Sequence, residues 1–274
     1  SGEVDTDNPE VTTFAGTGSQ GFGDGTGTAA KFKHPWGMTT DGTNLYVADS
    51  NNHRIRKIVI ATGVVTTFAG SGGQGAANGT GTAASFRYPA EITTDGTNLY
   101  VSDINNHTIR KIVIATKAVT TLAGSTAGFS DGTGPAARFQ SPYGITTDGT
   151  NLYVADAGNH KIRKIVISTG AVTTLAGSSA GFADGAGTAA SFNAPMGIAI
   201  DGTNLYVADY SNHNIRKIAL RATLTADVKL HNLDDDTDAT VNLASSDTGE
   251  ATVSPSSLTF TGNNWNTAQT VTLT

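Results

Sequence analysis

The stretch DGTNLYVADSNNHRIRKI, from Asp41 to Ile58, decides the fold because the chain contains it four times. The other copies start at Asp95, Asp148 and Asp201, at steps of 54, 53 and 53 residues. A fixed period of this size is the signature of a repeat architecture, in which each repeat forms one supersecondary unit. We therefore interpret most of the chain as an array of four equivalent units.

Each repeat contains four short runs of β-branched, aliphatic and aromatic residues, separated by turn residues such as Asp-Gly and Asn-Asn-His. A Pro precedes the first run of each repeat, where its missing N–H lies outside the ladder. The strands expected in the first repeat are Gly37–Thr40, Leu45–Asp49, Ile55–Ile60 and Val64–Ala69. A four-stranded antiparallel unit repeated at this length predicts an all-β fold, a β-propeller with four blades.

A Gly-rich connection leads into every repeat, and the first copy is GFGDGTGTAAKF from Gly21 to Phe32. Its Asp-Gly pair indicates a tight turn that needs a positive φ. Its Ala-Ala-x-Phe ending supplies an apolar anchor that we expect to hold the loop against the sheet.

The segment Val11–Gly16 (VTTFAG) has the sequence of a fourth strand but precedes the first repeat, whereas the last repeat loses its pattern after Leu220. We predict that this N-terminal strand completes the last blade and so closes the propeller. The alternative is that it completes a blade in a neighbouring molecule.

The motif Pro-x-Gly-Ile-x-x-Asp-Gly-x-Asn-Leu-Tyr-Val-Ala-Asp-x-x-Asn-His-x-Ile-Arg-Lys resembles the NHL repeat, and the resemblance covers residues 11–220. The resemblance implies propeller blades, which in NHL proteins most often number six in a ring. This chain departs from that pattern because it has four repeats. Some NHL-like propellers are metal-dependent lyases, and the resemblance keeps that activity as the weakest alternative.

Residues 221–274 alternate Thr and Ser with Val and Leu, which is typical of strands with one buried face. From Thr240 onward this part resembles the second half of bacterial extracellular Calx-β-like or immunoglobulin-like repeats. Four or five strands fit, fewer than a complete sandwich needs. The expected domains are a flexible acidic N-terminus (1–10), the propeller (11–220) and a small partial β-sandwich (221–274).

The chain carries a net charge of −6 and 15% charged residues, without a basic block that would indicate a nucleic-acid partner. No apolar run is long enough to span a membrane. The absence of cysteine favours a bacterial protein outside the cytoplasm, either extracellular or periplasmic.

The repeated His and Asp residues occupy the same place in every repeat, so blade geometry separates them too widely to share one metal ion. We interpret them as framework residues that stabilise turns by hydrogen bonds. These residues are His53, His107, His160 and His213, with Asp49, Asp103, Asp156 and Asp209.

Positions that differ between the repeats are the better candidates for a ligand site. The candidates are aromatic or apolar residues beside the Pro that opens the innermost strand, namely Trp36, Tyr88, Tyr143 and Met196, and Tyr210, which follows the Asp of the second strand. Such residues at one mouth of a propeller channel suit a sugar or a peptide. The alternative is that they only fill the channel or pack between blades.

An acidic run near the C-terminus, Asp234, Asp235, Asp236 and Asp238, is a candidate Ca²⁺ site because Ca²⁺ prefers carboxylate oxygens. A solvated loop is the alternative interpretation. The sequence predicts no catalytic residues. The leading hypothesis is a secreted, non-enzymatic binding or scaffold protein with a protein or glycan ligand. The main alternative is a subunit of an extracellular fibre or matrix, joined to copies of itself by strand exchange.

Overall fold

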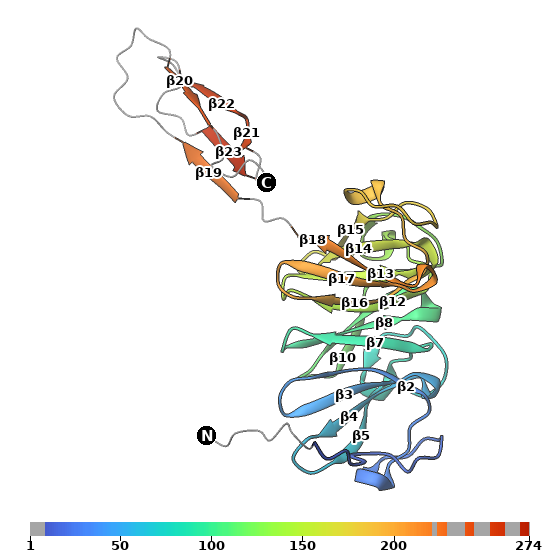
Figure 1. The fold of residues 1–274 in the computed structure, drawn as a ribbon. Helices are drawn as coiled ribbons and strands as arrows, with labels where there is room; N and C mark the ends of the chain where they lie inside the picture. The colour runs from blue at the N-terminus through green and yellow to red at the C-terminus, as the bar shows by residue number, and fades with distance from the viewer. Residues whose placement is uncertain (1–8, 221–223, 229–238, 244–252, 261–268, 274) are drawn as a thin grey trace. The chain divides into compact units, whose positions relative to one another are not determined.

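The computed structural model describes residues 9–220, 224–228, 239–243, 253–260 and 269–273. The chain divides into two compact units, Ser1–Ile218 and Ala219–Thr274. Both units consist of strands, and the first contains four similar sheets arranged as propeller blades (Figure 1). The predicted all-β, four-bladed architecture is therefore confirmed.

The first three blades have five strands each, and the described part of the fourth has three. Blade 1 consists of β1 (Gly25–Thr26), β2 (Pro35–Thr40), β3 (Asn44–Asp49), β4 (Arg54–Val59) and β5 (Val64–Ala69). Blade 2 consists of β6 (Gly79–Thr80), β7 (Pro89–Thr94), β8 (Asn98–Asp103), β9 (Thr108–Val113) and β10 (Ala118–Gly124). Blade 3 consists of β11 (Gly132–Thr133), β12 (Pro142–Thr147), β13 (Asn151–Asp156), β14 (Lys161–Val166) and β15 (Ala171–Ala176). Blade 4 consists of β16 (Pro195–Ile200), β17 (Asn204–Asp209) and β18 (Asn214–Ala219).

Short 3₁₀ helices accompany the strands at two recurrent places. The Gly-rich connections contain η1 (Gly27–Ala29), η3 (Gly81–Ala83), η5 (Gly134–Ala136) and η7 (Gly187–Ala189). The Asn-His turns contain η2 (Ser50–Asn52), η4 (Ile104–Asn106), η6 (Ala157–Asn159) and η8 (Tyr210–Asn212).

The strand that begins with Pro is the innermost of each blade, as the order β1-β5-β4-β3-β2 in blade 1 shows. These innermost strands pack on one another in sequence, β2 on β7, β7 on β12 and β12 on β16. The short strand of the Gly-rich connection pairs with the outer strand and forms the rim, for example Gly25 opposite Val65.

The N-terminal segment corrects one expectation. Residues 11–16 do not form a strand of blade 4 but lie beside blade 1, where the N–H groups of Gly16 and Thr17 bond the carbonyls of Gly27 (3.1 Å) and Ala30 (3.0 Å). Closure of the propeller by its own N-terminal strand is therefore wrong for this structure. The reason is geometric, because the Gly-rich connection of blade 1 holds this segment at the far end of the array from β18 (Figure 1).

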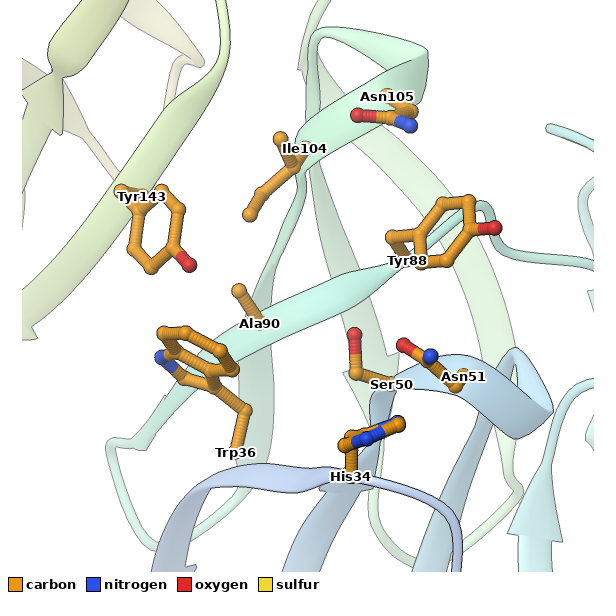
Figure 2. Close-up of a pocket in the computed structure, with 9 residues that line it drawn as sticks. All are labelled: His34, Trp36, Ser50, Asn51, Tyr88, Ala90, Ile104, Asn105 and Tyr143. Atoms are coloured by element: carbon orange, nitrogen blue, oxygen red, sulfur yellow. The ribbon is translucent and has the colours of Figure 1, made fainter.

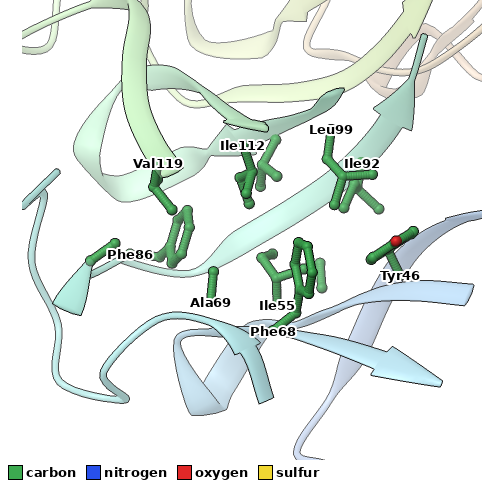
Figure 3. Packing of buried hydrophobic residues seen from close by; sticks show 12 residues of the cluster. Tyr46, Ile55, Phe68, Ala69, Phe86, Ile92, Leu99, Ile112 and Val119 are labelled. Carbon is green, nitrogen blue, oxygen red and sulfur yellow. The ribbon is translucent and has the colours of Figure 1, made fainter. Parts of the chain in front are cut away.

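The core lies between successive blades, because each blade has two different apolar faces. One face, here called the Tyr face, carries Tyr46 and Ile55 in blade 1. The other, the Leu face, carries Leu99 and Ile112 in blade 2. Figure 3 shows the Tyr face of blade 1 packed on the Leu face of blade 2. The same pairing of faces joins blades 2 and 3, where Tyr100 and Ile109 pack on Leu152 and Ile165.

The Asp-Gly turn of each repeat is closed by its own Asp. In blade 1, one carboxylate oxygen of Asp41 accepts the N–H groups of Thr43 (2.9 Å) and Asn44 (2.6 Å), and the other accepts the Tyr46 hydroxyl (2.9 Å). Partial desolvation raises the pKa of Asp41, but the bonds from Asn44, Thr43 and Tyr46 outweigh it and lower the pKa from 3.8 to about 2. The turn Asp is therefore ionised at neutral pH, and its bond to the Tyr46 hydroxyl holds that side chain at the edge of the Tyr face.

A buried ion pair holds the opposite end of each blade. Arg56 bonds Asp49 at 2.9 Å, and both side chains are fully buried. The same guanidinium also donates to the carbonyls of Lys31 and Gly23 and to the Asp24 carboxylate. It lies 5.1 Å from the centre of the Phe32 ring, the anchor that the Ala-Ala-x-Phe pattern predicts. The corresponding pairs of the other blades are Arg110–Asp103, Arg163–Asp156 and Arg216–Asp209.

The second unit forms two small sheets in its described residues. One has the order β19-β23-β21, with β19 (Leu224–Val228), β23 (Gln269–Leu273) and β21 (Val253–Ser254). The other pairs β20 (Ala239–Asn242) with β22 (Ser257–Phe260). The resemblance of this unit to Calx-β-like repeats stays a prediction.

The substitution Arg110→Ala tests the buried pair. Removing the guanidinium leaves the buried Asp103 carboxylate without its cation, which destabilises a protein by about 3–5 kcal/mol. Urea unfolding followed by far-UV circular dichroism measures this loss. The exposed Arg87 of the same repeat is the control, and Arg87→Ala is expected to change the free energy of unfolding by about 0.5 kcal/mol or less. Equal effects of the two substitutions would contradict the assigned role.

Candidate functional site

A pocket of about 410 Å³ opens where the chain enters the innermost strands of blades 1 to 3 (Figure 2). We call it the mouth pocket. Its lining residues come from the starts of β2, β7 and β12 and from helices η2 and η4. They are His34, Trp36, Ser50, Asn51, Tyr88, Ala90, Ile104, Asn105 and Tyr143.

The backbone before each blade-opening Pro directs side chains into this pocket. His34 and Tyr88 both have left-handed backbone conformations, with φ of 49° and 57°. Such a conformation is uncommon for residues other than Gly and is kept only where neighbours fix it. At Tyr88 the fixing neighbour belongs to the previous blade, because the Tyr88 N–H donates to Nδ1 of His53 at 3.3 Å.

The same bond recurs between the other blades. The N–H groups of Ser141 and Ala194 donate to Nδ1 of His107 (3.2 Å) and His160 (3.0 Å). His53, His107 and His160 are therefore framework residues, as predicted, but each links its blade to the next one rather than stabilising only a turn within its own blade.

Aromatic rings dominate one side of the mouth pocket. Trp36 of blade 1 and Tyr143 of blade 3 meet edge to face, with ring centres 5.3 Å apart and planes at 67°. Blade 2 has the small Ala90 at the position equivalent to these two residues, so the rings of Trp36 and Tyr143 can meet across it (Figure 2). The indole of Trp36 is 53% exposed. A bound molecule would therefore find an accessible apolar surface.

Polar groups form the other side. Asn51 and Asn105 occupy equivalent places in η2 and η4, next to Ser50 and Ile104. Their backbone N–H groups bond the carbonyls of Lys33 (3.1 Å) and Arg87 (3.2 Å), which fixes both residues at the rim. The pocket thus combines aromatic rings with two side-chain amides.

The structure brings Trp36, Tyr88 and Tyr143 together, three of the five residues predicted from repeat differences. Met196 and Tyr210, both from blade 4, are not among the residues that line the mouth pocket. The predicted Ca²⁺ ligands from Asp234 to Asp238 lie outside the described residues. In the parts that are described, no group of three or more His, Asp or Glu side chains is arranged to hold a metal ion.

Two residues near the pocket were missed by the sequence analysis. Glu91 follows Ala90 in β7 at a position that is Gly37, Gly144 and Gly197 in the other repeats. Ser102 of β8 stands where the other repeats have Ala. The signal was present in the sequence, since comparing the four copies position by position reveals both differences.

Ser102 and Glu91 connect blade 2 to Tyr143 of blade 3. The Ser102 hydroxyl donates to the Tyr143 carbonyl at 2.5 Å and accepts the Glu91 N–H at 3.0 Å. Burial raises the pKa of Glu91. Burial, and secondarily the charge of Glu91, raises the pKa of Tyr143. A carboxyl group thus lies beneath the aromatic side of the pocket.

Comparison with known proteins identifies an NHL repeat at residues 32–58. The chain is 34% identical over 239 residues to Protein SUPPRESSOR OF QUENCHING 1, chloroplastic, of Arabidopsis thaliana, covering 80% of this chain and 23% of that protein. It is 30% identical over 265 residues to NHL repeat-containing protein 2 of Homo sapiens, covering 82% of this chain and 36% of that protein. The chain therefore spans much less than half of either relative.

Two solved structures share the fold at low identity. An auxiliary nutrient binding protein from Bacteroides thetaiotaomicron has a TM-score of 0.57 at 22% identity, covering 69% of this chain and 49% of that one. A putative phosphatase from the same organism has a TM-score of 0.54 at 20% identity, with the same coverage. Among the residues described, no helix is both long and apolar enough to cross a membrane.

The substitution Glu91→Gln tests the buried carboxyl group. Because the pKa of Glu91 is raised in the folded protein, its neutral form is favoured there, and stability decreases as pH rises from the usual carboxyl pKa through the raised value. Glutamine has no charge to desolvate. We expect a higher Tm for Glu91→Gln than for the unsubstituted protein at pH 8, and a difference that shrinks toward pH 4.

Thermal unfolding between pH 4 and pH 8 measures this dependence. Glu10, exposed near the N-terminus, provides the control, and Glu10→Gln should leave the pH profile unchanged. A Glu91→Gln profile parallel to that of the unsubstituted protein would contradict the assignment.

Proposed function

We propose that this propeller, which carries an NHL repeat, is a non-enzymatic binding module whose mouth pocket holds a sugar ring of a glycan. The observation that carries the proposal is the pairing of Trp36 and Tyr143 around an open pocket that also presents the amides of Asn51 and Asn105.

The chemistry of the pocket suits a carbohydrate. The C–H face of a sugar ring is apolar and packs on exposed aromatic rings, while its hydroxyl groups require donors and acceptors such as side-chain amides. A volume of about 410 Å³ lies within the range of small-molecule sites. The fixed backbone at Tyr88 and Asn105 supports a preformed site, which reduces the entropy lost on binding.

Binding without bond cleavage agrees with the groups that line the pocket. Glycoside hydrolysis usually needs two carboxyl groups on either side of the scissile bond. The residues lining the mouth pocket include one imidazole, from His34, and no carboxylate. Glu91 lies next to the pocket wall rather than among these residues. We therefore assign the site to recognition.

A location outside the cell belongs to this proposal, because glycans on surfaces and in the medium are accessible there. A peptide ligand is the second candidate, since aromatic rings with flanking amides also suit a short extended segment. The two candidates are separated by the same binding experiment.

The test is a titration of the purified chain with a panel of mono- and oligosaccharides and with a peptide library, followed by isothermal calorimetry. We expect saturable sugar binding that Trp36→Ala weakens about 30-fold, the effect of about 2 kcal/mol lost at an aromatic hot spot. Tyr210→Ala removes an exposed ring outside the mouth pocket and should leave the Kd unchanged. Binding of peptides alone, or equal loss in both variants, would contradict the proposal.

A further inference from the structure

The N-terminal segment 11–16 makes the backbone hydrogen bonds that the outer strand of one blade makes to the next blade. Gly16 donates to the carbonyl of Gly27 at 3.1 Å, as Gly70 at the end of β5 donates to Gly81 at 3.1 Å. The next residue of each segment makes an equivalent bond. The Thr17 N–H donates to the carbonyl of Ala30, and the Ser71 N–H donates to that of Ala84. Segment 11–16 is therefore related to blade 1 as β5 is related to blade 2.

Blade 4 has the opposite deficiency. In blades 1 and 3 an outer-strand Thr donates to the Asp that pairs with the buried Arg, at 3.2 Å for Thr67 with Asp24 and 3.0 Å for Thr174 with Asp131. Within the described part of blade 4, Asp184 bonds Arg216 without a corresponding Thr, and the Asp184 side chain is 87% exposed against about half in the other two blades. The described part of blade 4 thus has no strand equivalent to segment 11–16.

Among the described residues, neither end face of the array has a blade packed on it, and the two faces differ: segment 11–16 and Phe32 partly cover the Leu face of blade 1, where Val47 and Ile58 are buried. At the blade 4 end, the Tyr face exposes Ile215 (69%) and Tyr206 (38%), whereas the equivalent Ile55 and Tyr46 are buried against blade 2 (Figure 3). At the blade 1 end, the Leu face exposes Met38 (57%), whereas the equivalent Ile92 is buried.

A cavity of about 350 Å³ lies on the Leu face of blade 1, between that face and segment 11–16. We call it the end cavity. Apolar side chains line it, among them Phe14, Phe32, Met38, Leu45 and Val47. In blade 2 the corresponding surface receives Tyr46 and Ile55 of blade 1.

We propose that a second copy of this chain closes both ends: segment 11–16 of each copy becomes the outer strand of blade 4 in the other, and the end cavity takes Tyr206 and Ile215. Each new interface would reproduce the Tyr face to Leu face contact that the chain already uses between its own blades. The occupant is thus specified by two internal examples of the same contact rather than by apolar exposure alone.

The repeat fixes the register of this contact. Thr66 of β5 lies opposite Lys57 of β4, and the same Thr–Lys pair recurs in blades 2 and 3. Thr12 of one copy is therefore expected opposite Lys217 of the other. The same correspondence places Thr13 against Asp184.

When two copies form one ring of eight blades, the Tyr face of blade 4 in each copy packs on the Leu face of blade 1 in the other. Propellers typically have four to eight blades, and three copies would exceed this range. A head-to-tail interface yields a closed ring when its rotation closes and an open filament when it does not. The proposal therefore specifies a particle of twice the 28.0 kDa chain mass.

Single cysteines at the predicted pair test the register, because the chain has no cysteine of its own. Directly opposed residues of paired strands lie within the distance that a disulfide spans. Thr12→Cys and Lys217→Cys chains are purified separately, mixed and oxidised. We expect a disulfide-linked dimer that contains the 12–217 peptide pair by mass spectrometry. Thr17→Cys mixed with Lys217→Cys is the misregistered control and should cross-link at least tenfold less.

The double variant Thr12→Cys/Lys217→Cys distinguishes closure between chains from closure within one. A cross-linked dimer supports the proposal. A cross-linked monomer, or no 12–217 disulfide in either experiment, overturns it.

Light scattering after size exclusion measures the stoichiometry of the unsubstituted chain at about 100 μM. The expected result is a dimer. Ile215→Asp places a charge on the exposed Tyr face and should give a folded monomer, whereas Ile60→Asp, which alters an exposed Ile elsewhere, should remain dimeric. A monomeric unsubstituted chain, a continuous series of larger species, or a dimer that survives Ile215→Asp would each overturn the proposal. Circular dichroism verifies that both variants are folded.

Discussion

The buried Arg–Asp pair is the constraint on which each blade depends. In blade 1 the carboxylate of Asp49 accepts the Lys33 N–H and the Asn52 amide as well as the Arg56 guanidinium. One pair thereby joins the entry of the innermost strand, the 3₁₀ turn and the third long strand, and Arg56 extends the network to the Gly-rich connection. Removing these charges from water is unfavourable, so the arrangement depends on the partners of the carboxylate and of both terminal guanidinium nitrogens, while the buried Nε atoms of Arg56, Arg110 and Arg163 have no hydrogen-bond partner. This requirement explains why the Asp, Asn, His and Arg positions are the same in all four repeats.

The hydrogen bonds to the repeated His residues connect each blade to the next and so join the repeats into one array. His53 adopts a left-handed conformation that ends η2 and directs its ring toward the next repeat, where it meets the Tyr88 N–H. The residue before each Pro is held in turn in its own left-handed conformation. Framework residues and pocket residues are therefore close in sequence, but only the pocket residues differ between the repeats. The His is fixed by its bond, while the side chain at Tyr88, Ser141 or Ala194 varies without disturbing that bond.

Much of this was predictable from the sequence. The strands, the number of blades and the aromatic group of Trp36, Tyr88 and Tyr143 follow from the repeat and from differences between its copies. The position of segment 11–16 could not be predicted from the sequence. Its residues match those of an outer strand, but they do not indicate which blade it contacts. Met196 and Tyr210 do not line the mouth pocket because it lies across blades 1 to 3, and nothing in the repeat indicates which blades contribute to one pocket. Glu91 and Ser102 were missed because attention fell on aromatic positions alone.

A blade with two unlike faces has a consequence that a symmetric unit would not have. However many blades are added in a row, one Tyr face and one Leu face remain without a neighbouring blade. Hydrophobic burial between blades supplies most of the favourable free energy, so these two faces are also the least stable part of the array. The side chains reflect this, since Ile215 is exposed where three equivalent residues are fully buried. The mouth pocket lies on blades 1 to 3, away from the Tyr face of blade 4 that would be covered. The proposed ring closure and the proposed ligand site therefore lie on separate surfaces.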